Sequence, residues 1–268
     1  KKSTIAYVDM SGKKMNTIHA NNEDFYRELN EVIQYEPLTS GNPHFRGMVA
    51  AIGIQKGKVF KPKGKYLNTL KEAAAIANVH ARNQAFRPDN KSVYFFGKNR
   101  QWFLPFGSTM SHEFKQDGRI FIDDRIAFHY MATGITPLMT AKFDGKGSSY
   151  LVTTTDSTGA SLEGNKVYTI TLPANPPMKR FWSFMVYDNQ TRSILATDQR
   201  SGGFDSTGDL FTNKDGSVTV TFSKNKPKGK SNWVQTLPNK GFFVMFRMYS
   251  PLKAWHDRKY IIGDLEKK

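Results

Sequence analysis

Polar side chains crowd the loop after one apolar stretch, and they include the residue types of a reaction or binding centre. Residues 181–202, FWSFMVYDNQTRSILATDQRSG, have the pattern of a sandwich or barrel strand that runs into a charged loop. A turn such as DNQTR needs Asp or Asn to satisfy exposed backbone donors, and a nearby Arg can bond to the carboxylate. The Gly pair at 202–203 is instead typical of a binding-loop rim. Turn scaffolding and pocket lining therefore both remain open for Tyr187, Asp188, Arg192, Asp198, Gln199 and Arg200.

A second group of candidates lies near the C-terminal end, in MFRMYSP. Strand alternation places Arg247 and Tyr249 on one face, opposite their apolar neighbours. Beside Trp233 in SNWVQ they could form an aromatic and polar concavity suited to a sugar or a small amphiphile. A solvent face decorated with Tyr and Arg is the simpler alternative. We therefore predict ligand binding at the sheet face and its loop rim, with no catalytic residue assigned, by Arg247, Tyr249, Trp233, Asp188 and Arg200.

The histidines are scattered, which argues against a metal centre. The chain has six, and no two of them are three or four residues apart. The segments SHEF and DDRIAFHY hold the only local mixture of oxygen and nitrogen ligands, and a helix cap with hydrogen-bonded histidines is the simpler interpretation. These residues are His112, Glu113, Asp123, Asp124 and His129. We predict no metal and no cofactor.

Nucleophilic catalysis has no compact motif in this sequence. The absence of cysteine excludes disulfides, thiolate metal sites and cysteine nucleophiles. Asp156, Ser157 and Gly159 in TDSTG suit a β-turn, with pocket contact as the alternative. No Gly-x-Ser-x-Gly elbow presents a serine for hydrolysis. The sequence therefore favours binding over catalysis.

The positive charge of the chain is concentrated in loop-like runs. Lys and Arg number 39 against 23 Asp and Glu, a formal charge of +16. Much of the excess lies in KGKVFKPKGK at 56–65 and KNKPKGK at 224–230, which indicates solvated loops, with an anionic polymer or lipid surface as the alternative. No nucleic-acid-binding motif is present, so we predict no nucleic-acid partner. No apolar stretch approaches the roughly 20 residues of a membrane span, and the N-terminal segment lacks the apolar region of a signal peptide.

The pattern of apolar residues changes from helical to extended along the chain. Helical spacing or composition predicts helices over 21–34, 44–53 and 66–85. After Pro88 the runs become short and β-like, apart from one helix near 123–134. Five stretches rich in β-branched and aromatic residues follow: SSYLVTTTD, KVYTITLP, FWSFMVYD, SVTVTFS and GFFVMFRMYS. We predict an α+β fold with a mainly helical region at 1–90 and a mainly antiparallel, jelly-roll-like β-sandwich at 91–268.

Several stretches of the sequence, in the same order along the chain, resemble those of a bacterial protein family. TTTDSTGASLEGNKVYTITLP, PPMKRFWSFMVYDNQTRSILATDQ and KSNWVQTLPNKGFFVMFRMYSPL resemble the C-terminal half of bacterial proteins with paired domains of unknown function 1254 and 1214. Upstream, VDMSGKKMNTIHANNEDFYRELNEVIQYEP and AAIGIQKGKVFKP resemble their connecting region. RSGGFDSTGDL at 200–210 departs from the family's Tyr-Ser-Ile-Gly-Asp-type stretch. The resemblance implies a 1214-type domain at 91–268, a periplasmic or secreted location, and a further N-terminal portion in the complete protein.

Two functions follow as hypotheses. The first is an extracytoplasmic β-sandwich that binds a glycan, a lipid-like molecule or another small ligand. The alternative is a hydrolase or lyase acting on a carbohydrate or small molecule, with a site completed by the N-terminal domain that the resemblance implies. In either case we expect a homo-oligomer or a companion N-terminal chain. The surface that contacts the implied N-terminal portion should be apolar, and large apolar patches are rarely left uncovered on soluble monomers.

Overall fold

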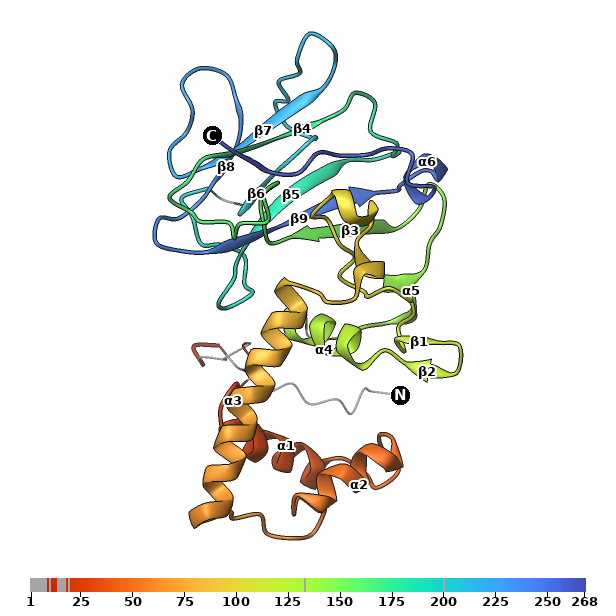
Figure 1. Ribbon diagram of the computed structural model, residues 1–268, viewed down its shortest axis with the longest axis vertical. Helices are drawn as coiled ribbons and strands as arrows, with labels where there is room; N and C mark the ends of the chain where they lie inside the picture. Colours follow the sequence, from red (N-terminus) through yellow and green to blue (C-terminus); the bar gives the residue numbers. More distant parts are fainter. Residues whose placement is uncertain (1–8, 10, 14–17, 19, 133, 200) are drawn as a thin grey trace. The chain divides into compact units, whose positions relative to one another are not determined.

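The computed structural model describes residues 9, 11–13, 18, 20–132, 134–199 and 201–268. These form two compact units, Lys1–Asn78 and Val79–Lys268 (Figure 1). The sequence-based division at residue 90 stays a prediction. Among the predicted site residues, Arg200 lies outside the described residues.

Helices build the first unit. They are α1 (Asp24–Tyr35), α2 (Pro43–Ala51) and the start of α3 (Gly64–Phe86). α2 begins where Asn42 accepts a hydrogen bond from the backbone of His44 at 2.8 Å, with Pro43 in the first helical turn. Ile33, Val49 and Ile54 are the buried centre of this unit.

The loop between α2 and α3 is fastened to the end of α1. The Lys56 ammonium donates to the Glu36 carbonyl at 2.8 Å, and the Gln34 side chain accepts from the backbone of Gly57 at 2.8 Å. A cation near the last carbonyls of a helix also offsets the negative end of its dipole. At least one lysine of the basic run at 56–65 is therefore structural.

Two four-stranded sheets form the sandwich of the second unit. The first has the order β3-β9-β5-β6, with bounds Ser148–Thr153, Phe242–Tyr249, Trp182–Asp188 and Gly203–Asp205. The second has the order β10-β4-β7-β8, with bounds Glu266–Lys267, Tyr168–Leu172, Val218–Ser223 and Asn232–Gln235. The sheets are not closed, and the predicted α+β class is confirmed.

One strand pair departs from the antiparallel expectation. β7 and β8 are parallel, because the loop at 224–231 carries the chain back before β8 begins. The buried side chain of Asn232 fixes that start: it donates to the carbonyls of Phe211 and Thr219 at 2.8 Å and accepts from the Phe211 backbone at 2.9 Å. The other strand pairs in both sheets are antiparallel.

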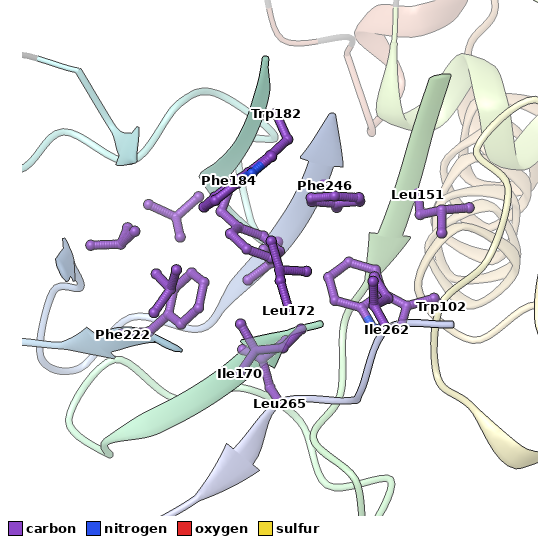
Figure 2. Close-up of a cluster of buried hydrophobic side chains, with 14 of the residues drawn as sticks. Trp102, Leu151, Ile170, Leu172, Trp182, Phe184, Phe222, Phe246, Ile262 and Leu265 are labelled. Carbon is purple, nitrogen blue, oxygen red and sulfur yellow. The ribbon is translucent and has the colours of Figure 1, made fainter. Parts of the chain in front are cut away.

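Aromatic side chains fill the space between the sheets (Figure 2). Phe184 of β5 lies with its ring centroid 4.9 Å from Phe246 of β9 and 5.8 Å from Phe222 of the opposite sheet. Such pairs add roughly 0.5–1.5 kcal/mol beyond the burial of their area. Trp102 and Trp182 are also buried in this core. The even-numbered residues of β5 and β9 therefore face inward.

Short elements and helices precede and follow the strands of the first sheet. The 3-10 turns η1 (Lys91–Val93) and η2 (Gly97–Asn99) lead to the hairpin β1 (Lys115–Gln116) and β2 (Arg119–Ile120). Next come α4 (Ile122–Met131) and α5 (Pro137–Thr140), while α6 (Lys253–His256) follows β9. Phe86 at the end of α3 and Met131 of α4 pack on the buried group of Val93, Phe103, Val152 and Phe243. No helix in the described part of the chain is long and apolar enough to cross a membrane.

Candidate functional site

Outward-pointing side chains of β3, β5 and β9 gather an arginine among tyrosines. Tyr150 pairs directly with Arg247 across β3 and β9. Phe246 and Met248 are fully buried, so alternation turns Arg247 and Tyr249 to the outer face, where both remain partly exposed. We call Tyr150, Tyr187, Arg247 and Tyr249 the arginine–tyrosine face.

The rings hold the guanidinium in place. The Arg247 Cζ lies 5.3 Å from the Tyr150 ring centroid and 5.5 Å from that of Tyr249. Phe181 stacks on Tyr249 with centroids 4.1 Å apart, and the Ser148 hydroxyl donates to the Tyr150 hydroxyl at 2.6 Å. A guanidinium near ring faces gains cation–π attraction, which is larger when it is desolvated. The side chain is therefore held in one orientation.

Electrostatics keep this face cationic near neutral pH. Burial raises the pKa of Tyr187 and of Tyr249, against a smaller lowering effect of Arg247 on each. Burial alone would lower the pKa of Arg247, but its hydrogen bond with Tyr150 and the nearby tyrosine hydroxyls raise that pKa above its usual value. Tyr187 and Tyr249 are therefore neutral hydrogen-bonding groups beside a permanent cation.

Arg247 has an unmatched hydrogen-bond donor. Its Nε is buried and has no hydrogen-bond acceptor among the described residues. The ion pairs found in the described residues do not include Arg247. A buried donor left unpaired costs roughly 1–3 kcal/mol, more when the group is charged. The guanidinium of Arg247 therefore lacks both an acceptor for Nε and a carboxylate partner among the described residues.

A small cavity adjoins the same tyrosine. Tyr150 also lines a space of about 20 Å³, together with Lys142, Lys146 and His256. That volume is enough for about one water molecule. The Nε2 of His256 is buried without a partner among the described residues, and burial, aided by Arg258, lowers the pKa of Lys142. This cavity is too small for an organic ligand.

Asp188 and Arg192 serve the turn after β5. Asp188 is buried, accepts from the backbones of Gln190 and Thr191 at 2.7 and 3.3 Å, and pairs with Lys240. Burial alone would raise the pKa of Asp188, but the Lys240 ammonium and these two backbone groups lower it. Arg192 adopts φ 61°, donates to the Tyr130 carbonyl at 3.0 Å, and lies with its Cζ 4.2 Å from the Tyr130 ring centroid. These contacts fit the scaffolding interpretation, and a ligand contact by Asp188 stays a prediction.

Trp233 does not join Arg247. It lies on β8 of the second sheet, where its neighbour Val234 points into the core, so Trp233 faces outward from that sheet. Its indole donates to the Ser223 carbonyl at 3.0 Å. Arg247 faces outward from the first sheet, on the other side of the sandwich. The expectation that both form one concavity is therefore wrong, because alternation fixes the face of a strand and says nothing of the sheet that the strand joins.

The loop with Asp198 and Gln199 binds the edge of β8. Gln235 donates its backbone N–H to the Gln199 side chain at 2.7 Å, and the Gln199 amide donates to the Trp233 carbonyl at 3.2 Å. The Gln235 side chain in turn donates to the Asp198 carboxylate at 2.8 Å. These side chains occupy backbone groups that an edge strand would otherwise leave free.

The candidate metal ligands serve as structural links. Asp124 is buried and accepts from the Ser108 backbone and hydroxyl, each at 2.8 Å, and from Asn90. Asp123 pairs with His80 at 3.0 Å, and both side chains are exposed. The described residues contain no group of three His, Asp or Glu side chains that could hold a metal ion.

Sequence reasoning missed Tyr150, and it named Tyr187 only as a candidate in the loop cluster at 187–200. Tyr150 lies in SSYLVTTTD, nearly a hundred residues before Arg247, and only the register of β3 on β9 brings the two together. An outward tyrosine in a predicted strand was the available signal. It identifies a face but not its neighbours, because strand pairing is a long-range property.

Comparisons with known proteins give one family match and two similar solved structures. Residues 147–253 match a family model described as "Protein of unknown function (DUF1214)". The VPA0106 protein from Vibrio parahaemolyticus is 18% identical, with a TM-score of 0.45, over 100% of this chain and 59% of that one. A putative uncharacterized protein from Burkholderia cenocepacia is 16% identical, with a TM-score of 0.36, over 78% of this chain and 44% of that one. The chain thus spans about half the length of these two proteins, and it matches no curated protein.

Proposed function

We propose that the sandwich is a binding domain whose arginine–tyrosine face holds a small, hydroxyl-rich ligand that carries a negative charge. One observation carries the proposal. Arg247 is a partly buried cation whose Nε has no acceptor and whose guanidinium has no carboxylate partner among the described residues. A carboxylate on the ligand supplies a charged partner for the guanidinium, with a charge-assisted hydrogen bond.

The tyrosines suit the rest of such a ligand. Tyr150 and Tyr249 flank the guanidinium with flat rings, on which the C–H face of a sugar can pack. A tyrosine hydroxyl group can both donate and accept hydrogen bonds, as the hydroxyls of a sugar require. A few polar groups that converge on an aromatic surface are typical of small-molecule sites. A sugar acid, such as a uronic acid unit of a glycan, therefore fits this chemistry.

The test is a titration with sugar acids. We expect glucuronate or an oligomer of galacturonate to bind saturably by calorimetry, and neutral glucose to bind much more weakly. Arg247→Gln is expected to weaken binding of the acid about tenfold or more, as for the loss of a hydrogen bond to a charged group. Arg125→Gln is the matched control, because Arg125 is an exposed arginine on α4 outside this face.

Two results would reject the proposal. One is the lack of saturable binding of any sugar acid by the folded parent chain. The other is an equal loss of affinity in Arg247→Gln and Arg125→Gln, which would indicate a net-charge effect. Release of a shortened or unsaturated sugar during the titration would instead support the hydrolase or lyase alternative.

We further propose a periplasmic or secreted location. This rests on the resemblance to bacterial proteins with paired domains of unknown function 1254 and 1214, together with the match of residues 147–253. Osmotic-shock fractionation of the producing cells tests the location of the complete gene product. Retention of that product with the cytoplasmic fraction would contradict it.

A further inference from the structure

We infer that a groove beside the end of α3, distinct from the arginine–tyrosine face, binds a small organic anion with a planar apolar body. Two adjoining cavities of about 280 and 290 Å³ form this groove. They share the lining residues Asn83, Phe86, Arg87 and Thr154. Small-ligand pockets begin at roughly 300 Å³, so each cavity approaches that size. We call Arg82, Phe86, Arg87, Lys91 and Thr154 the α3 groove.

Secondary structure sets the spacing of the two arginines. Arg82 and Phe86 are four residues apart on α3 and share one face, with the Arg82 Cζ 5.0 Å from the Phe86 ring centroid. Arg87 follows directly after the last helical residue. The Thr154 hydroxyl, just beyond β3, donates to the Phe86 carbonyl and ties the end of the helix to the sheet.

Each arginine is anchored by only part of its hydrogen-bonding capacity. Arg82 donates to the Asn189 carbonyl at 2.7 Å. Arg87 donates through one nitrogen to the Gly159 carbonyl at 3.2 Å and to the Ser161 hydroxyl at 3.3 Å. A guanidinium has five N–H donors, so these contacts orient both groups and leave donors available to a ligand. Holding a cation in position in advance lowers the entropy lost on binding.

The charges of the groove do not cancel. Arg82, Arg87 and Lys91 line it against one carboxylate, that of Asp89. Asp89 accepts a hydrogen bond from Gln84 at 2.9 Å, and the ion pairs found in the described residues include none of the four. Cations at the end of a helix also offset its dipole, which corresponds to about half a negative charge. The three cationic side chains carry more positive charge than the Asp89 carboxylate and the helix dipole together offset. The groove therefore keeps a net positive charge.

The remaining walls indicate the body of the ligand. Phe86 lies in the overlap of the two cavities, Tyr94 and Phe103 line the first, and Phe242 lines the second. Asn189 also lines the second cavity. A carboxylate or phosphate head would meet the arginines while an aromatic or similarly flat body lies on these rings.

Four probes test the chemistry of this ligand. Phenyl phosphate and benzoate carry the two candidate heads on a flat ring, inorganic phosphate lacks the ring, and phenol lacks the charge. By calorimetry at low ionic strength we expect saturable binding of phenyl phosphate or benzoate, whichever head the groove prefers, at least about tenfold tighter than that of phosphate or phenol. Lack of saturation by both charged aromatics, or equal binding of inorganic phosphate, would overturn the inference.

Substitutions of single arginines test whether the preferred probe binds in the α3 groove. Arg87→Gln is expected to weaken binding of the preferred probe about tenfold or more, and because Arg87 is exposed its loss leaves the fold intact. Arg82→Gln is expected to act in the same direction. Arg125→Gln should leave affinity within about twofold, since Arg125 does not line the groove. An equal effect of Arg125→Gln and Arg87→Gln, or a larger effect of Arg247→Gln than of Arg87→Gln, would overturn the assignment to this groove.

Discussion

Some polar side chains of this protein support the fold, and others are available to a ligand. Asp188 is an example of the first kind. Each of its contacts is internal: two backbone N–H groups of its own turn and the ammonium of Lys240. Arg247, by contrast, has a buried Nε with no acceptor among the described residues. A satisfied buried group supports the fold, whereas an unsatisfied one needs a further explanation. That contrast places the search for ligands at Arg247.

Asp188 should make stability depend on pH in acid. Its pKa is lowered in the folded state, so its contribution is complete above the unfolded value near 3.9 and disappears as the pH falls through the lower folded value. Asp188→Asn should therefore reduce the free energy of unfolding by about 2 kcal/mol at pH 7, with a shrinking difference below about pH 4. Urea denaturation of both proteins between pH 7 and pH 2 measures this. A difference that stays constant over the whole range would contradict the role of the charge.

At the scale of elements, burial patterns were predictable and long-range pairing was not. Alternation in MFRMYSP correctly predicted that Arg247 and Tyr249 share a face, because this needs only the two-residue period of a strand. The partner strand of each face depends on contacts far apart in sequence. For that reason Tyr150 was missed and Trp233 was placed on the wrong side of the sandwich. The parallel β7–β8 pair was missed for the same reason.

One close approach between loops needs a glycine, and it gives a prediction for an element. A Cβ added at Gly164 would lie 1.8 Å from the Leu237 carbonyl oxygen, where the turn before β4 meets the loop before β9. Gly164→Ala must displace backbone, so we expect a loss of about 3 kcal/mol, near the upper end for overpacking. Thermal unfolding should show a decrease of roughly 6–12 °C.

The control for this prediction is another glycine-to-alanine change. A Cβ added at Gly208 would have no neighbouring atom within 4 Å, and the φ of Gly208 is not in the left-handed region. Gly208→Ala should therefore stay within about 0.5 kcal/mol of the parent. Similar midpoints for both variants would show that the loops at 164 and 237 separate without cost.

At the scale of the whole molecule, apolar side chains are exposed on the first unit. Phe25 and Val32 lie two turns apart on α1, with 46% and 53% exposure, while Phe45 and Met48 lie one turn apart on α2, with 48% and 60%. Both pairs have the spacing of residues on one helix face. Isolated apolar side chains are ordinary on a protein surface, but repeated pairs at this spacing are typical of helices that contact a partner.

We therefore expect the isolated chain to form a dimer through its first unit. Sedimentation velocity at rising concentration should show a dimer, and the double change Val32→Ser and Met48→Ser should shift the equilibrium toward monomer. A symmetric dimer would lose four such side chains, each worth roughly 1.5–3 kcal/mol when fully buried, so the dissociation constant should rise by more than about a thousandfold. Ile194→Ser is the matched control, because Ile194 is 52% exposed and belongs to the second unit. A parent chain that remains monomeric at about 100 μM, well above the micromolar constants of stable dimers, would contradict self-association and leave a companion chain as the partner to seek.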